Sequence, residues 1–146
     1  MESGVSGIDE KEVTKIVEPQ VELLNVVMSI LEKNCGLKQK KISLKELEAK
    51  GGIYAELGTG FEETRYFNKT AIKTMPILFM CRDKSQLDCL GQLSHICNYL
   101  RSLQEYPDGD TFSWIDTAVA KEPSKIGRDE DGTYHYSCII NCKIYY

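Results

Sequence analysis

The sequence contains few of the residues, and none of the short motifs, that most often mark an enzyme. Only two histidines, His95 and His135, are present among its 146 residues. The glycine pattern at Gly58-Thr59-Gly60 lacks the third glycine of a dinucleotide fingerprint and the Lys-Ser/Thr ending of a phosphate-binding loop. Neither G-x-S-x-G nor H-E-x-x-H occurs in the chain. These absences argue against the commonest nucleotide-dependent and hydrolytic activities.

Basic residues are not in excess either. The chain has 18 Lys and Arg against 22 Asp and Glu, which gives a net charge of -4. Proteins that hold nucleic acid through its phosphates are usually basic, so this balance argues against such a function. Lys38, Lys40 and Lys41 form one local basic cluster that stays open as a contact, although we expect it to be a solvated loop.

The sequence has no long apolar run. Its longest apolar stretch, Val21 to Leu31, is interrupted by Glu22, Asn25 and Ser29 and is too short to span a bilayer. The first residues, MESGVSGIDEKEV, have neither the basic nor the apolar region of a signal peptide. We therefore expect the protein in a reducing cytoplasm, where an even count of 6 cysteines does not imply disulfides.

The spacing of apolar residues predicts two helices. The first is expected to begin at Glu18-Pro19 and to end before Gly36, the expected left-handed cap. The second is expected to run from a cap at Asp83 or Ser85 to about Glu105. The core stripe expected for the first helix comprises Val21, Leu24, Val27, Met28 and Leu31. The stripe expected for the second comprises Cys89, Leu93, Ile96, Leu100 and Leu103, flanked by Leu90 and Cys97.

The remaining apolar segments predict strands. The expected strands are Ile53–Leu57, Thr64–Asn68, Ala71–Arg82, Thr111–Ala120 and a last one that ends the chain. We expect the first two to form a hairpin across Gly58–Gly60. Pro76 cannot donate to a ladder, so the third is expected at an edge or a bulge. Its apolar residues on both faces predict that it is covered on both sides.

The order of these elements predicts the fold class. Strands that do not alternate regularly with helices favour an α+β fold, here a mixed, largely antiparallel sheet packed against two main helices. The length fits one core. We expect a flexible lead-in over residues 1–10 and a single domain over residues 11–146. Residues 38–50 stay open between a short extended piece and a helical turn.

The segment DGTYHYSCIINCKIYY, which ends the chain, has the residue types of a metal or redox site. A period of two places Cys138 and Cys142 on an apolar face and His135 on the opposite, mostly polar face. Residues four apart on a strand are separated by about 13 Å. That separation is too large for one disulfide or one zinc ion. We therefore expect both cysteines to be small buried hydrophobes, with no metal and no cofactor.

Two acidic clusters, Glu62-Glu63 and Asp129-Glu130-Asp131, are possible cation sites by residue type alone. Both lack the ligand spacing of a calcium loop, so we expect solvated turns. A small enzyme that uses His135 with Asp129, Glu130 or Asp131 stays open as an alternative. It would need a pocket in which these groups converge with perturbed pKa values.

The succession of segments resembles a known family. An N-terminal helix is followed by GGIYAELGTG, RYFN, MPILFMCRDKSQLDCLGQL and TFSWIDTAVAKEPSKIGRDEDGTYHYSCIINCKIYY. This order resembles the phage minor capsid protein family of Gram-positive phages and prophages, whose role is that of tail terminator. The resemblance covers about residues 9–146, and Met1 to Ile8 lie outside it. Its most specific parts are Asp83-Lys84-Ser85-Gln86 and the passage from Pro123 through Gly132 into the tyrosine-rich strand.

The resemblance implies a virion protein with a tail-terminator-like α+β fold and no enzymatic activity. Such a protein is made in the host bacterial cytoplasm and forms a homohexameric ring. The ring caps the head-proximal end of the tail tube, stops its polymerisation and provides the surface for head-tail joining. The implied partners are further copies of itself, the tail tube protein, a head-completion or connector protein and, in a contractile tail, the sheath protein. Genomic DNA would pass through the ring without specific binding.

Two turns are candidates for the contacts of such a ring. The first comprises Gly58, Gly60, Phe61, Glu62 and Arg65, and the second comprises Arg128, Asp129, Glu130 and Asp131. We expect the glycines to let the first turn reach out and Phe61 to be an aromatic anchor among charges. The alternatives are that Phe61 folds back onto the sheet and that the acidic turn is only solvated. A small cytoplasmic ligand-binding or regulatory domain is the alternative to the whole assignment.

Overall fold

The computed structural model describes residues 18–37, 42–43 and 52–146. In chain order the elements are α2 (Pro19–Asn34), β1 (Ile42–Ser43), β2 (Gly52–Leu57), β3 (Phe61–Arg65), β4 (Ala71–Asp83), α3 (Gln86–Arg101), β5 (Ser113–Arg128) and β6 (Tyr134–Tyr145). This order confirms the predicted α+β class. The expected lead-in over residues 1–10, the cluster at Lys38–Lys41 and the ambiguous residues 44–50 lie outside the described ranges.

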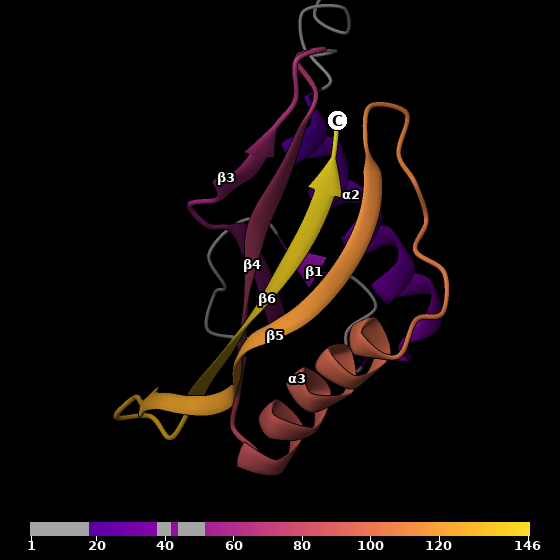
Figure 1. Cartoon of the computed structure of the whole chain (residues 1–146). Coiled ribbons are helices and arrows are strands. Elements are labelled where there is room, and N and C mark those ends of the chain that lie inside the picture. Colours follow the sequence, from indigo (N-terminus) through magenta and orange to yellow (C-terminus); the bar gives the residue numbers. More distant parts are fainter. Residues whose placement is uncertain (1–17, 38–41, 44–51) are drawn as a thin grey trace, which may run out of the picture.

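One mixed sheet organises the chain (Figure 1). Its strand order is β1-β2-β4-β6-β5, and β3 pairs with β4 beside this path. β1 and β2 are parallel, and every other pair is antiparallel, as predicted. β4 and β6 pair along their length and form the centre of the sheet. β5 therefore forms one edge, and β3 and β1 lie toward the other.

The hairpin predicted between Ile53–Leu57 and Thr64–Asn68, which correspond to β2 and β3, is wrong. β2 and β3 do not pair with each other; β2 lies against the second half of β4 and β3 against its first half. The hairpin instead joins β3 to β4 through residues 66–70, where the Tyr66 amide donates to the Thr70 carbonyl at 2.8 Å. The chain between β2 and β3 simply crosses from one half of β4 to the other.

Pro76 lies in the interior strand β4, so the prediction of an edge position is also wrong. On the side of β4 that pairs with β2 and β3, Pro76 lies in the gap between these two strands. The last pair of β2 is Leu57 with Ile77, and the first pair of β3 is Phe61 with Thr74. The Pro76 carbonyl accepts a hydrogen bond from the Gly58 amide at 2.8 Å. The gap in the ladder tolerates proline because an amide proton is not needed there.

The helix boundaries follow the predicted signals closely. Pro19 opens α2, and Gly36 follows it with φ of 61°. Ser85 caps α3 by accepting a hydrogen bond from the Asp88 amide at 3.2 Å. α3 ends at Arg101 and not near Glu105. The prediction was too long because Leu103 continues the apolar pattern, although it packs against the core from the following loop. Neither described helix is long and apolar enough to cross a membrane.

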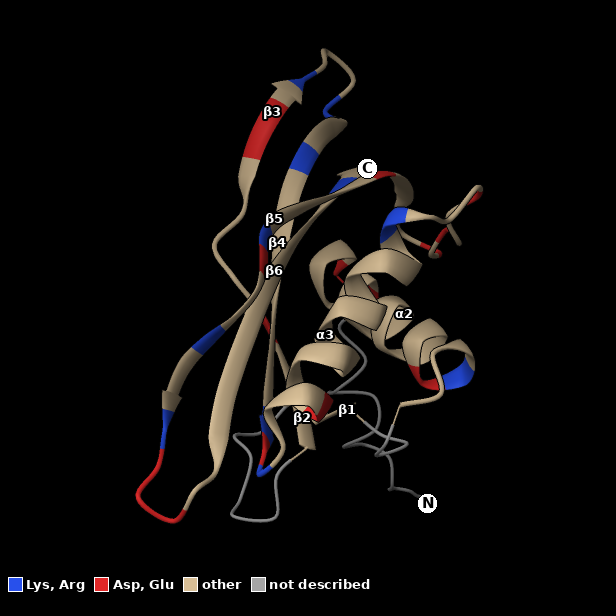
Figure 2. Ribbon diagram, turned by 90° about the horizontal axis from the view of Figure 1, so that it is seen from below, with Lys and Arg blue, Asp and Glu red and all other residues tan. Residues whose placement is uncertain are grey.

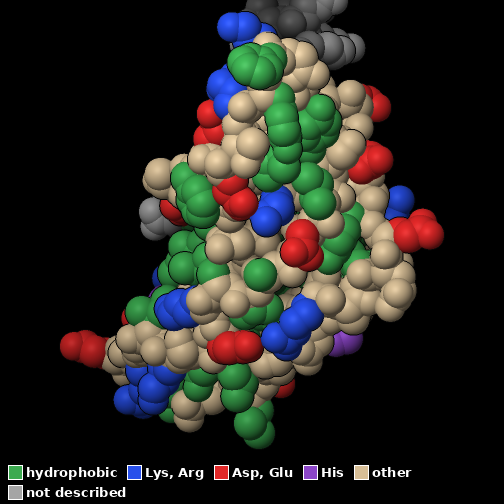
Figure 3. Space-filling view, in the orientation of Figure 1, with side chains coloured by type: hydrophobic (Ala, Val, Ile, Leu, Met, Phe, Trp, Pro, Cys, Tyr) green, Lys and Arg blue, Asp and Glu red, His purple; other side chains and the backbone are tan. Residues whose placement is uncertain are grey.

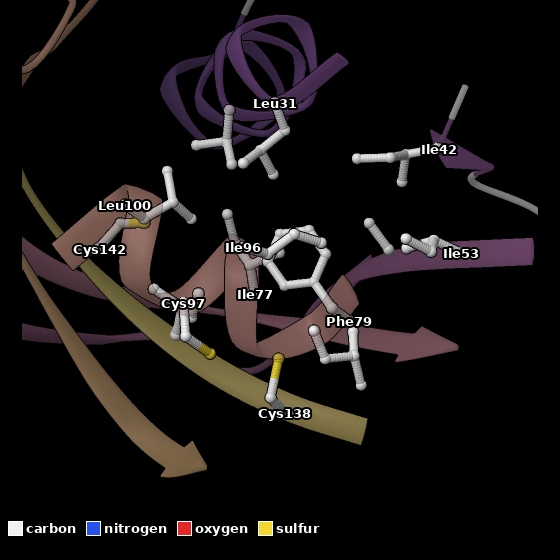
Figure 4. Packing of buried hydrophobic residues seen from close by; sticks show 14 of the residues in the cluster. Leu31, Ile42, Ile53, Ile77, Phe79, Ile96, Cys97, Leu100, Cys138 and Cys142 are labelled. Atoms are coloured by element: carbon white, nitrogen blue, oxygen red, sulfur yellow. The ribbon is translucent and has the colours of Figure 1, made fainter. Parts of the chain in front are cut away.

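Both described helices lie on the same face of the sheet (Figure 2). The core between them is built from α2, α3 and the facing side chains of the strands, as Figure 4 shows. Side chains with no exposed surface there include Leu23, Val27, Leu31, Ile77, Phe79, Leu93, Ile96, Leu100, Ile140 and Ile144. The α2 stripe differs from the predicted one at Val21, which is 52% exposed.

No described helix covers the opposite face of the sheet. There the β4 residues Leu78 and Met80 are half-buried, whereas Ile77, Phe79 and Cys81 on the helix side are buried. The prediction that β4 is covered on both sides therefore holds for one face only. Apolar residues on both faces of a strand indicate cover or contact on both, and no described helix supplies that cover on the second face.

The last strand has the two faces that its sequence predicts. Cys138 and Cys142 are completely buried, and all six cysteines of the chain are buried free thiols. Sequence spacing did not indicate that Cys97 of α3 meets Cys138 of β6, with their sulfur atoms on facing sides (Figure 4). The thiol contact and burial raise the pKa of Cys138, and burial raises that of Cys142 to about 12.

A single carboxylate ties α2 to the start of β5. Glu22 Oε1 accepts hydrogen bonds from the Thr111 amide (2.8 Å) and hydroxyl (2.6 Å), and Oε2 accepts one from the Asp110 amide at 2.6 Å. A Cβ on Gly109 would lie 2.3 Å from the Phe112 ring and 2.5 Å from Glu22 Oε1, so the loop needs glycine there. These contacts fix where the long edge strand begins.

We predict that Cys138 and Cys142 are replaceable structural residues. Cys138→Ala and Cys142→Ala should each lower the free energy of unfolding by about 1 kcal/mol, because each removes a small buried group. Urea titrations measure the loss. Both thiols should react with iodoacetamide only after unfolding, since burial keeps them protonated and shielded. Stoichiometric zinc that disappears in the double variant would contradict this reading.

The Glu22 carboxylate should make stability depend on acid pH. The bonds from the Thr111 side chain and from the Asp110 and Thr111 backbone hold its pKa below the ordinary value of 4.5. The stabilisation is therefore present above pH 4.5 and is lost as the pH falls through the lower pKa of the folded state. In urea titrations, Glu22→Gln should be less stable than wild type at pH 7 and lose less stability below pH 4.5. Glu130→Gln, at an exposed turn, is the control, and equal acid sensitivity in all three proteins would exclude the role.

Candidate interaction surfaces

Of the predicted contact residues, Gly58–Arg65 lie at the β2–β3 crossing and in β3, which leads into the β3–β4 turn, whereas Arg128–Asp131 lie at the β5–β6 turn. The β3–β4 turn lies at the top of Figure 1, and the β5–β6 turn projects at its lower left. β4 and β6 run between them, so the first group of predicted residues, from Gly58 to Arg65, and the second, from Arg128 to Asp131, do not meet within one copy. They are two separate surfaces.

Gly58 and Gly60 have a different role from the predicted one. They lie at the crossing between β2 and β3, not at the tip of a turn. A Cβ on Gly60 would stand 2.5 Å from Met75 Sδ and 2.7 Å from the Thr74 carbonyl oxygen. Glycine is therefore required there for close approach to β4, and it does not extend the turn outward.

The strand β3 presents an exposed aromatic and a self-paired set of charges. All five residues of β3 are exposed; Phe61 is 59% exposed and borders a concavity on the face of the sheet. Arg65 donates to both carboxylate oxygens of Glu62, from Nε at 3.0 Å and from Nη2 at 2.7 Å. This pairing holds the pKa of Glu62 below and that of Arg65 above the ordinary value. The two charges are therefore paired with each other within β3.

The tip of the β3–β4 hairpin is an aromatic surface that the sequence analysis missed. The side chain of Phe67 is completely exposed, and Tyr66 packs edge-on against Tyr145 with the ring centres 6.1 Å apart. The Tyr145 hydroxyl donates to Thr70 Oγ1 at 3.1 Å, which anchors the turn to β6. A concavity of about 500 Å³ lies among these residues and Asn68. Hydrophobic atoms gather over this end of the molecule in Figure 3.

The signal for this tip was present but was assigned to the wrong element. The segment RYFNKT places two aromatic residues directly before Asn68-Lys69, and Lys69 adopts φ of 75°. A left-handed residue after asparagine is turn chemistry. The predicted strand Thr64–Asn68 included these residues because tyrosine and phenylalanine also favour strands.

The helix-free face of the sheet carries a small polar site built from four strands. Glu63 accepts a hydrogen bond from the Thr74 hydroxyl, and Lys143 Nζ lies 3.4 Å from Glu63 Oε1. Asp116 lies opposite Lys143 on β5. The bond from Thr74 and the contacts with Lys143 hold the pKa of Glu63 below its ordinary value. These residues and Phe61 line a concavity of about 260 Å³, which only the pairing of the strands brings together.

The second predicted turn is an exposed hairpin tip. Asp129, Glu130 and Asp131 are exposed, and the ribbon in Figure 2 is continuously acidic along this turn, with basic residues beside it. The Asp129 amide donates to the Thr133 carbonyl at 2.8 Å, and the Thr133 amide donates to Asp131 Oδ1 at 3.0 Å. These bonds from the Thr133 backbone and side chain hold the pKa of Asp131 below its ordinary value. The bonds between Thr133 and the two aspartates hold the shape of the turn, and Glu130 is exposed at its tip.

The arrangement around His135 does not resemble an acid-base site. His135 Nε2 lies 3.0 Å from Asp129 Oδ2, a contact that becomes an ion pair when the imidazole is protonated. Asp131 is directed at Thr133, and its lowered pKa makes it a weaker base. The carboxylates of the turn thus do not converge on the histidine in an enclosed pocket. Within the described residues, no group of three or more His, Cys, Asp or Glu side chains is placed to hold a metal ion.

Comparison with known proteins gives one family. The family model described as bacteriophage tail terminator protein matches residues 32–146. The match takes in the end of α2 and everything that follows it: all the strands of the sheet, α3 and both hairpin tips. A search of curated proteins found no match.

We predict that the acidic tip contributes to assembly and not to folding. Glu130→Lys, and the triple reversal of Asp129, Glu130 and Asp131 to lysine, should weaken association of the protein with its own copies or with tails. Charges on a loop held by a rigid scaffold commonly carry binding. Asp131→Asn is the matched control, because it tests the turn without reversing charge. Circular dichroism verifies folding, and tail assembly by the triple variant at the wild-type level would refute the role.

Proposed function

Since this chain belongs to the bacteriophage tail terminator family, we propose that it forms a homohexameric ring at the head-proximal end of the tail tube. The ring stops polymerisation of the tube and provides the surface for joining the head. The observation that carries the proposal is the match over residues 32–146, which includes the whole sheet and α3. The role is structural and needs no catalytic group.

The surfaces described above suit a ring. A cyclic ring of more than two copies uses heterologous contacts, in which one patch of each copy binds a different patch of the next. The chain offers different patches at its two sheet edges. β3 at one edge exposes Phe61, and β5 at the other exposes Ile115 and Ile126. We propose that these residues are the apolar centres of the two contact patches.

A cap on a tube also needs two different ends, one for the tube and one for the head. The two hairpin tips differ in this way, since one is aromatic around Phe67 and the other is acidic around Glu130. We propose that these ends contact the tail tube protein and a head-completion or connector protein, with the sheath protein as a further partner in a contractile tail. The net charge of -4 favours passage of genomic DNA without binding.

Deleting the gene from the phage should give tails of uncontrolled length or tails that cannot join heads. The physical reason is that an uncapped tube end continues to offer its subunit-binding surface. Electron microscopy of the particles measures both effects, and a plasmid copy of the wild-type gene should restore uniform tails. Uniform tails that join heads normally without the protein, or a monomeric protein in the assembled virion, would show that the assignment is wrong.

A further inference from the structure

Two exposed hydrophobic residues lie at the same level on opposite edges of the sheet. Strand pairing gives a row in which Phe61 of β3 lies opposite Thr74 of β4, and Thr74 opposite Lys143 of β6. Lys143 in turn lies opposite Asp116 of β5. Ile115 is the extra residue beside Asp116, at the irregularity after Trp114. Phe61 is 59% exposed and Ile115 is 44% exposed.

The shared level matters for closing a ring. Heterologous contacts close into a ring only when successive copies are related by rotation without a rise, and otherwise they generate an open helix. With the strands directed along the ring axis, two complementary patches on the same row meet without a rise. Phe61 and Ile115 satisfy this condition because one row of paired residues passes from β3 to β5.

The charges on either side of this row are complementary. Lys69 lies in the β3–β4 turn, which is at the top of Figure 1, and Lys73 lies in β4 with its Nζ 4.9 Å from the ring centre of Tyr146 in the same chain. At the same end of the sheet, the loop entering β5 carries Asp108 and Asp110, both exposed. Oppositely charged groups at matching ends of the two edges favour the hairpin of one copy beside the β5 entry of the next.

At the start of β5, contact through side chains is favoured over extension of the sheet by another strand. The Trp114 amide already donates to Asp108 Oδ1 at 3.2 Å, and the Thr117 amide donates to Asp116 Oδ1 at 2.8 Å. These two backbone donors of β5 therefore have partners within their own chain. Side-chain protection of this kind prevents edge strands from pairing indiscriminately.

We propose that Phe61 of one copy packs against Ile115 of the next, with Lys69 facing the Asp108 and Asp110 loop, and that this contact repeats around the ring. The occupant of each edge is thus a second copy of this chain. The inference rests on the proposed ring and goes further by naming its two contact surfaces. It also assigns an intersubunit role to Ile115 and Lys69.

Cross-linking between single-cysteine variants tests the contact. Phe61→Cys and Ile115→Cys add one exposed thiol each, while the six native cysteines are buried. A short bismaleimide should join the two variants to each other when they are mixed and should join neither to itself. The double variant should give a ladder that ends in one closed species. Leu87→Cys, on α3 and 80% exposed, is the matched control and should not join either variant.

Self-association of a charged variant tests the same contact without a cross-linker. Phe61→Asp should weaken self-association by about tenfold, the effect of losing roughly 1.4 kcal/mol of contact energy. Leu87→Asp should leave it unchanged. Sedimentation measures both, with circular dichroism to verify folding.

The outcomes separate this inference from the proposed function. Both experiments are made in solution and on tails assembled with the variants. Tails that contain the protein as a ring but give no link between the two variants overturn the contact and leave the ring intact. Self-linking of either single variant also overturns it, because it indicates a symmetric contact. Tails that contain no ring of this protein contradict the proposed function, and the contact falls with it.

Discussion

Burial of one face of a single sheet beneath α2 and α3 is the constraint on which the rest of the structure depends. A strand alternates its side chains between faces, so covering one face fixes the register of β4 and β6. A slip of one residue would turn Phe79 and Ile140 out of a core in which they have no exposed surface. The same register sets which residues stand at each edge and at each turn. The Glu22 carboxylate completes this arrangement, because it holds the loop that determines where β5 begins.

One-sided burial also decides which surfaces remain for other molecules. The face without a described helix, the two edges and the two hairpin tips carry most of the exposed aromatic and charged groups discussed above. Such surfaces suit a protein that acts by shape and charge complementarity. They do not supply the enclosed, converging titratable groups that acid-base catalysis requires. A structural role, as the tail terminator family suggests, is consistent with exposed surfaces on a rigid sheet.

Local features were predictable from the sequence, and pairing features were not. The alternation of Tyr134 to Tyr146, the cap at Ser85 and the stop at Gly36 depend on neighbours within a few residues, and the structure confirms them. The partner of β3 depends on which stretch of β4 is left unpaired by β2, which no local pattern encodes. Pro76 illustrates the difference, because its missing amide proton signals a gap in a ladder but not the position of its strand. The candidate surfaces followed the same division. The exposed β5–β6 turn was anticipated, whereas the β3–β4 tip was read as a strand and the polar site around Glu63 and Lys143 required the register of four strands.

The way in which β5 is protected bears directly on how a terminator can end an assembly. An open strand edge whose amides seek partners can extend a sheet without limit. In this chain Asp108 and Asp116 occupy amides at the start of β5, and the bulges along the strand disturb its ladder. Association through side chains on one row then has a fixed geometry, and rotation without a rise returns to its starting point after a set number of copies. In the ring that we propose, each of these side-chain contacts is used by a neighbouring copy, so no further copy can add around the ring.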